Sequence, residues 1–118
     1  MSKKTFRILL VVYLFVILAA STIPGGKMLK FEIWSFDKIL HIVEYFILAF
    51  LAINAFGKVS TTSIIVIIII GSAYGGFNEI WQGLVADRYA SIYDALANAI
   101  GMVIGSILSI KYLLLKHD

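Results

Sequence analysis

The sequence contains no cysteine and only one proline, and it is short of charged residues. Without cysteine, the chain cannot form disulfides, thiolate nucleophiles or Cys-ligated metal sites. Charged residues make up 14% and apolar residues 61%, against about 25% and about 45–50% in soluble domains. A soluble fold of 118 residues buries only about two-thirds of its unfolded surface, which cannot hide this much hydrocarbon from water. These shortages exclude a soluble enzyme, a disordered chain and a disulfide scaffold, and they favour a small integral membrane protein.

Four apolar segments are long enough to cross a bilayer, which takes about 20 helical residues at a rise of 1.5 Å each. Their predicted bounds are 6–23, 36–56, 61–84 and 92–115. The β-branched run 64–70 would suggest a buried strand in water, but in lipid the backbone must satisfy its own hydrogen bonds, which favours a helix. We therefore predict an all-α integral membrane protein, a four-helix transmembrane bundle in a single domain over 1–118.

The first segment has some features of a secretory signal. It has a basic start and small residues at Ala19, Ala20 and Ser21. Its apolar stretch is long for a signal, so we expect it to be a membrane span.

The placement of lysine and arginine predicts the orientation. Four spans put both termini and the middle connection on one side, which carries Lys3, Lys4, Arg7, Lys58, Lys111 and Lys116. The other side carries Lys27, Lys30, Lys38 and Arg88. Because basic residues favour the cytoplasmic side, both termini are predicted to be cytoplasmic. The net charge of +3 then reports topology and does not indicate nucleic-acid binding.

Polar residues gather at the predicted outer ends of spans two, three and four. On the second span, Asp37, His41 and Glu44 fall within about 60° of one another at 100° per residue. An ionised group at the bilayer centre costs about 2.5–3.5 kcal/mol, so several such groups should face one another. We predict one outward-facing, acidic pocket. Its expected residues are Asp37, Lys38, His41, Glu44, Tyr45, Glu79, Gln82, Arg88, Asp94 and Asn98.

A structural explanation exists for six of these residues. Asp37, Lys38 and Asp94 also fit simple helix ends in the headgroup region, where charge is cheap. His41, Glu44 and Glu79 lie deeper, so the alternative for them is hydrogen bonding between helices. Ionisable groups inside a membrane are nevertheless functional candidates by default.

Small residues recur every four positions on the fourth span, at Ala97, Gly101 and Gly105. The third span has glycines of its own at 71, 75 and 76. Such residues let helices approach closely, so we predict contact between spans three and four, with homodimerisation as the alternative.

The ordered polar residues resemble the VanZ-like family over nearly the whole chain. The residues that carry the resemblance are Ser21-Thr22-Ile23-Pro24, Asp37-Lys38-xx-His41-xx-Glu44-Tyr45, Asn78-Glu79-xx-Gln82 and Arg88-xxxxx-Asp94-xxx-Asn98-xx-Gly101-xxx-Gly105. The resemblance implies a small bacterial plasma-membrane protein, related to one associated with resistance to the glycopeptide teicoplanin. Some members carry a phosphotransbutyrylase label, which no phosphate-binding glycine loop in this sequence supports.

Three functions are compatible with these residues. In the first, the pocket binds a lipid headgroup, a lipid-linked cell-wall precursor or the antibiotic. Lys38 and Arg88 would then contact phosphate, while Tyr45 and Gln82 would donate hydrogen bonds.

The second function is an intramembrane enzyme acting on a lipid-linked envelope substrate, with His41 as base, Glu44 as its orienting group and Glu79 as acid. His41, Glu44, Glu79 and Asp94 are suitable ligand types for a divalent cation, but their spacing alone does not assign a metal site. We therefore predict no metal ligands. The sequence identifies no cofactor. The third function is a small proton-coupled transporter. Whether the chain is an enzyme stays open at this stage, as does its oligomeric state.

Overall fold

A computed structural model describes residues 2–22, 34–57, 60–85 and 91–116, with the backbone alone for 34–37 and 115–116. It contains four helices, α1 (Lys3–Ser21), α2 (Trp34–Phe56), α3 (Thr61–Val85) and α4 (Ile92–Lys116). Their bounds lie within three residues of the predicted spans, which confirms the all-α fold. Each helix is long and apolar enough to cross a membrane, so the chain is a multi-pass membrane protein that associates with the lipid bilayer.

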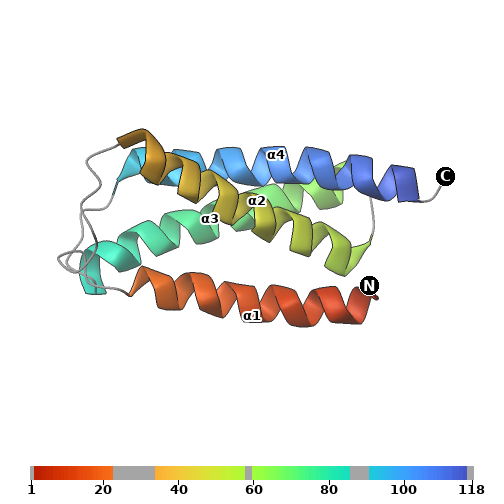
Figure 1. Ribbon diagram of the computed structural model, residues 1–118, viewed down its shortest axis with the longest axis horizontal. Coiled ribbons are helices and arrows are strands. Elements are labelled where there is room, and N and C mark those ends of the chain that lie inside the picture. The colour runs from red at the N-terminus through yellow and green to blue at the C-terminus, as the bar shows by residue number, and fades with distance from the viewer. Residues whose placement is uncertain (1, 23–33, 58–59, 86–90, 117–118) are drawn as a thin grey trace.

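The four helices form an elongated bundle of 48 × 25 × 22 Å (Figure 1). The start of α1, the end of α2, the start of α3 and the end of α4 lie together at one end. At the opposite end, which we call the polar end, α1 and α3 finish and α2 and α4 begin. This alternation brings the polar residues of α2, α3 and α4 to the same end of the bundle.

The predicted contact between the third and fourth spans does form, but the small residues of α4 do not take part in it, because they pack against α2. A Cβ added at Gly101 would collide with the carbonyl oxygen of Ile42, and one at Gly105 would lie 2.5 Å from the carbonyl oxygen of Phe46. The series continues to Ser109, which is fully buried. Close backbone approach is what such a series provides. Gly101 and Gly105 do face a neighbouring helix, as the small-residue spacing predicts, but that helix is α2.

The α3–α4 contact uses other residues. Gly71 lies against the side chain of Met102, and Gly75 against Asn98. Asn98 directly follows Ala97, and Met102 directly follows Gly101. One position is a rotation of about 100° around the helix, so these side chains point toward α3 while the small residues face α2. Gly76 has no neighbouring atom within 4 Å among the described residues, so it belongs to neither contact.

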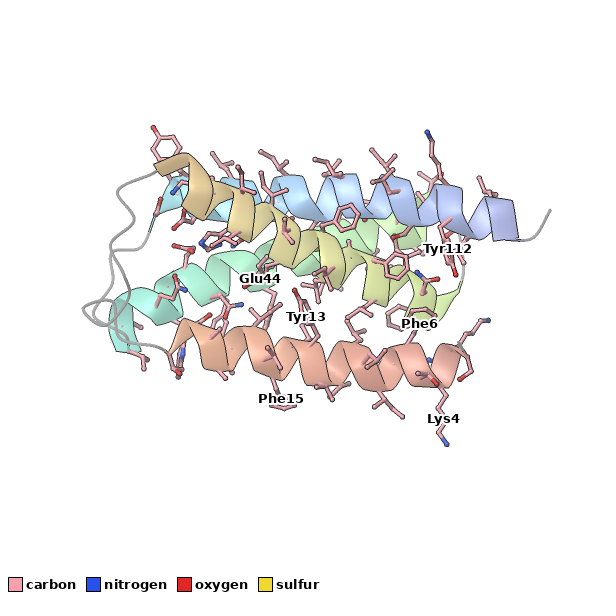
Figure 2. The ribbon with its side chains drawn as sticks, in the orientation of Figure 1. Lys4, Phe6, Tyr13, Phe15, Glu44 and Tyr112 are labelled. Carbon is pink, nitrogen blue, oxygen red and sulfur yellow. The ribbon has the colours of Figure 1, made fainter. Side chains whose placement is uncertain are left out.

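The buried core of the bundle consists of Ile17 of α1, Tyr45, Leu48 and Ala49 of α2 and Met102 of α4, and side chains of α3 pack against it. On the outer surface, large apolar side chains point away from the bundle. Figure 2 shows Phe15 directed away from the other helices, and 69% of it is exposed. Exposed apolar groups of this size suit hydrocarbon and not water.

Helix α1 is fixed to its neighbours by polar contacts as well. The Arg7 Nε donates to the carbonyl oxygen of Ala55 at 3.0 Å, near the end of α2. The Tyr13 hydroxyl donates to the backbone carbonyl of Glu44 at 2.7 Å, and these two residues face each other in Figure 2. A basic group at a helix C-terminus meets carbonyls that have no partner within the helix.

Candidate functional site

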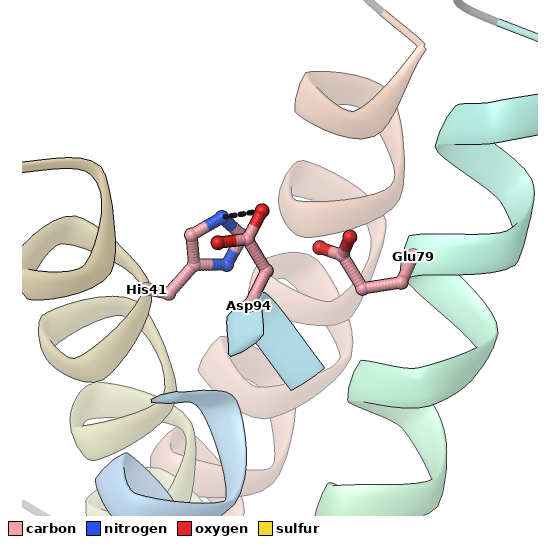
Figure 3. Close-up of side chains that lie close together, drawn as sticks. All are labelled: His41, Glu79 and Asp94. Atoms are coloured by element: carbon pink, nitrogen blue, oxygen red, sulfur yellow. Dashed lines mark ion pairs between the residues drawn. The ribbon is translucent and has the colours of Figure 1, made fainter. Parts of the chain in front are cut away.

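Three ionisable side chains from three helices converge at the polar end. His41 of α2, Glu79 of α3 and Asp94 of α4 each offer a ligand atom, and these atoms all lie within 4.8 Å of one another (Figure 3). We call this group the His–Glu–Asp cluster. Glu79 is 4% exposed and Asp94 9%, so both carboxyl groups have left water, which is costly unless they are hydrogen-bonded or paired.

The orientation of the His41 ring follows from its neighbour Asn98. The Asn98 Nδ2 donates to the carbonyl oxygen of Gly75 at 3.4 Å. A carbonyl can only accept, so the Asn98 Oδ1 faces the other way and lies 2.8 Å from the His41 Nδ1. Nδ1 therefore carries the hydrogen. The second ring nitrogen, Nε2, faces Oδ2 of Asp94 at 3.6 Å.

The start of α4 positions both carboxylates. Ser91 caps this helix, because its Oγ accepts from the backbone N–H of Asp94 at 3.3 Å. The backbone N–H of Ser91 in turn donates to Oε2 of Glu79 at 3.1 Å. Two carboxylates thus lie beside the N-terminus of α4, where the helix dipole favours negative charge.

Lys38 adds a positive charge to the site, because its Nζ forms an ion pair with Oδ1 of Asp94. The side chains of Lys38 and Asp94 keep 16% and 12% of their surface exposed. The site is therefore mostly enclosed, and small parts of Lys38 and Asp94 stay exposed.

A second polar network lies one turn deeper and joins three helices. The Ser21 Oγ of α1 donates to Oδ1 of Asn78 on α3 at 3.0 Å. The Asn78 Nδ2 donates to the Tyr45 hydroxyl of α2 at 3.0 Å. Tyr45 is fully buried. This network links α2 and α3, two of the three helices that carry the cluster, to α1, so Tyr45 is placed to support the site from within the bundle.

The other expected site residues lie apart from the cluster or outside the described side chains. Glu44 follows His41 by three residues and lies beside Tyr13 of α1 (Figure 2); its carboxylate is not one of the converging groups. Gln82 is buried on α3, one turn beyond Glu79. The side chain of Asp37 and the whole of Arg88 lie outside the described residues.

Ser91, Asn78 and Ser21 have roles that the predicted site does not include. A serine three residues before an acidic residue at a helix start is the usual capping signal, and it could have indicated Ser91. Asn78 and Ser21 belong to the family-like pattern, but no spacing rule links them, because 57 positions separate them along the chain.

The side chains of the cluster and its neighbours are chemically suited to three functions. An imidazole with one hydrogen-bonded nitrogen, next to carboxylates, can transfer protons. One nitrogen and two carboxylates can also bind a metal cation. Lys38 and the amide groups can contact a polar headgroup.

Comparisons with known proteins agree with the motif resemblance. A search of curated proteins and a search of solved structures returned no match. The comparison with protein families matched the VanZ/LLP1 family over residues 5–115, which includes every residue of the cluster and nearly all of the four helices. On the strength of that match, the chain belongs to the VanZ/LLP1 family.

Proposed function

We propose that this protein lies in a bacterial plasma membrane with both termini in the cytoplasm, and that its polar end faces outward. The observation that supports this orientation is the excess of lysine and arginine toward the opposite end, where Lys3, Lys4, Arg7 and Lys111 are found. Substrates and antibiotics of the cell envelope would then reach the polar end directly.

The site at this end is proposed to bind the polar headgroup of a lipid-linked envelope ligand and, through it, to lower sensitivity to teicoplanin. The supporting observation is the convergence of His41, Glu79 and Asp94 from three helices. Ionisable groups that converge inside a transmembrane bundle are functional candidates by default. Partial exposure of Lys38 and Asp94 leaves the site accessible to a headgroup at the membrane surface, while the lipid tail would lie along the apolar outer surface.

The test is to express the chain in a teicoplanin-susceptible Gram-positive host and to measure the inhibitory concentration of the antibiotic. The wild type should raise it, and Asp94→Asn should return it to the vector level at an equal amount of protein in the membrane. Phe15→Leu is the matched control, because Phe15 faces away from the bundle and should keep full tolerance. An unchanged inhibitory concentration with the wild type, or full tolerance with Asp94→Asn, would contradict the proposal.

A second candidate function is an intramembrane enzyme that acts on the same class of ligand. The observation in its favour is the fixed His41 ring, whose Nε2 faces a carboxylate while Asn98 holds Nδ1. That arrangement suits a general base with an oriented ring. Chromatography of a polyprenyl diphosphate lipid incubated with the purified chain separates the two functions, since an enzyme converts the lipid and a binding protein returns it unchanged.

A further inference from the structure

We propose that His41, Glu79 and Asp94 bind one divalent transition-metal cation, of which Zn²⁺ and Mn²⁺ fit best. Each of the three residues comes from a different helix, and their ligand atoms lie within 4.8 Å of one another. The cation would therefore join α2, α3 and α4 at the polar end (Figure 3).

The orientation of His41 is the observation that points to a metal. A histidine that binds a metal through one nitrogen usually donates the hydrogen of the other nitrogen to an oxygen acceptor, which fixes the ring. Here Asn98 accepts from Nδ1 at 2.8 Å, and Gly75 fixes the Asn98 amide. The lone pair of Nε2 is thereby directed into the group of carboxylates.

The separation of Nε2 from its neighbour fits two ligands of one ion. Nε2 lies 3.6 Å from Oδ2 of Asp94, which is longer than a direct hydrogen bond. Two ligands at about 2.1 Å from a shared ion lie about 3.0–3.5 Å apart. Two acceptors that face each other at this range repel unless a proton or a cation lies between them. The widest pair, at up to 4.8 Å, needs to close by at most about 1.3–1.8 Å, which rotation about the side-chain torsions of Glu79 can provide.

Charge and ligand type select the class of cation. Glu79 and Asp94 supply two carboxylate ligands, and Lys38 is paired with Asp94 through Oδ1. Carboxylates attract a cation strongly in a site of low dielectric. Imidazole nitrogen suits Zn²⁺ and related ions, carboxylate oxygen suits Mn²⁺, and Ca²⁺ and Mg²⁺ prefer oxygen alone.

A bound cation would also resolve a difficulty of the proposed function, on which this part of the inference rests. The carboxylates of Glu79 and Asp94 repel the phosphate of a lipid-linked headgroup. A divalent cation bound between them offsets their charge, and a metal ion can coordinate phosphate oxygens directly. Cation binding is nevertheless measured without lipid or antibiotic, so the two proposals can fail separately.

The experiment uses the full chain, purified in detergent and stripped with a chelator, then titrated with Zn²⁺ and with Mn²⁺ in a calorimeter. We expect one cation per chain for at least one of the two metals. Glu79→Gln and Asp94→Asn, which keep the shape of each side chain, should each weaken binding by more than about 100-fold. Asn98→Ala should weaken it by about 10–100-fold, because it releases the His41 ring. Glu44→Gln removes a carboxylate of the same helix outside the cluster, and it should bind as the wild type does.

Melting temperatures measured with and without the metal distinguish a variant that has lost the metal site from one that folds poorly. A cation that binds the folded state raises the melting temperature of the wild type and of Glu44→Gln. It should leave His41→Gln and Glu79→Gln unchanged. Absence of binding and of a thermal shift for both metals in the wild type would overturn the proposal, as would wild-type affinity in Glu79→Gln and Asp94→Asn. If the wild type gives teicoplanin tolerance but binds neither metal, this inference alone is overturned. If it binds a metal but gives no tolerance, the proposed resistance function alone is overturned.

Discussion

Replacement of Gly101 by alanine tests the closest contact in the bundle. A Cβ at this position would overlap the Ile42 carbonyl oxygen and lie 3.1 Å from both the carbonyl carbon of Ile42 and the backbone nitrogen of Phe46. These are backbone atoms of α2, which cannot move aside by a rotamer change. Overpacking of this kind costs about 1–3 kcal/mol, and alanine regains about 1 kcal/mol of helix propensity over glycine. The expected net effect of Gly101→Ala is a loss of up to about 2 kcal/mol in the free energy of unfolding.

The assay is reversible unfolding in a mild detergent, followed by far-ultraviolet circular dichroism. Gly76→Ala is the matched control, because the same methyl group there meets no described atom within 4 Å. That variant should be as stable as the wild type or up to about 1 kcal/mol more stable. Gly101→Leu should lose more than Gly101→Ala, since the longer side chain must separate α4 from α2. If Gly101→Ala unfolds at the same denaturant concentration as Gly76→Ala, then α2 and α4 do not approach as closely as described.

Three further predictions follow from other contacts. Lys38→Met removes the partner of Asp94 and should lower the unfolding free energy by about 3 kcal/mol. The double variant with Asp94→Asn should recover part of the loss, and additive effects in this double-mutant cycle would show that the ion pair contributes nothing to stability. Asn78→Leu breaks the network between three helices and should cost about 1–2 kcal/mol in the same unfolding assay; a wild-type midpoint would mean that the network is not formed. Because the chain lacks cysteine, a single cysteine introduced at Ser60 or at Ser91 can be labelled in intact cells with a membrane-impermeant maleimide. We expect labelling at position 91 only, and labelling at position 60 only would reverse the proposed orientation.

Much of the site followed from the sequence, because helix geometry and chain reversal together determine which residues share one end of a bundle. His41, Glu79 and Asp94 lie far apart in the sequence, yet four spans of similar length must bring the start of α2, the end of α3 and the start of α4 together. Position along each helix follows from counting residues at 1.5 Å each. The sequence therefore predicts which groups share a depth, and His41, Glu79 and Asp94 do converge.

Composition and length by themselves determined the class of the molecule. A chain that is 61% apolar and 14% charged cannot bury its hydrocarbon in a soluble fold of this size, and lipid permits only structures that satisfy their own backbone. Four helices at nearly the predicted bounds follow from that constraint alone.

The tertiary structure decided how each helix is rotated about its axis. Spacing within a helix gives angles between its own side chains, but rotation relative to a neighbour depends on how all four surfaces interlock. Gly101 therefore meets α2 and not α3, and Glu44 lies beside Tyr13 and not in the cluster. Hydrogen bonds between distant positions had no signal in the sequence at all. Only the folded chain brings the Ser91 amide to Glu79 and the Asn98 amide to His41, because these contacts require three helices to be in place at once.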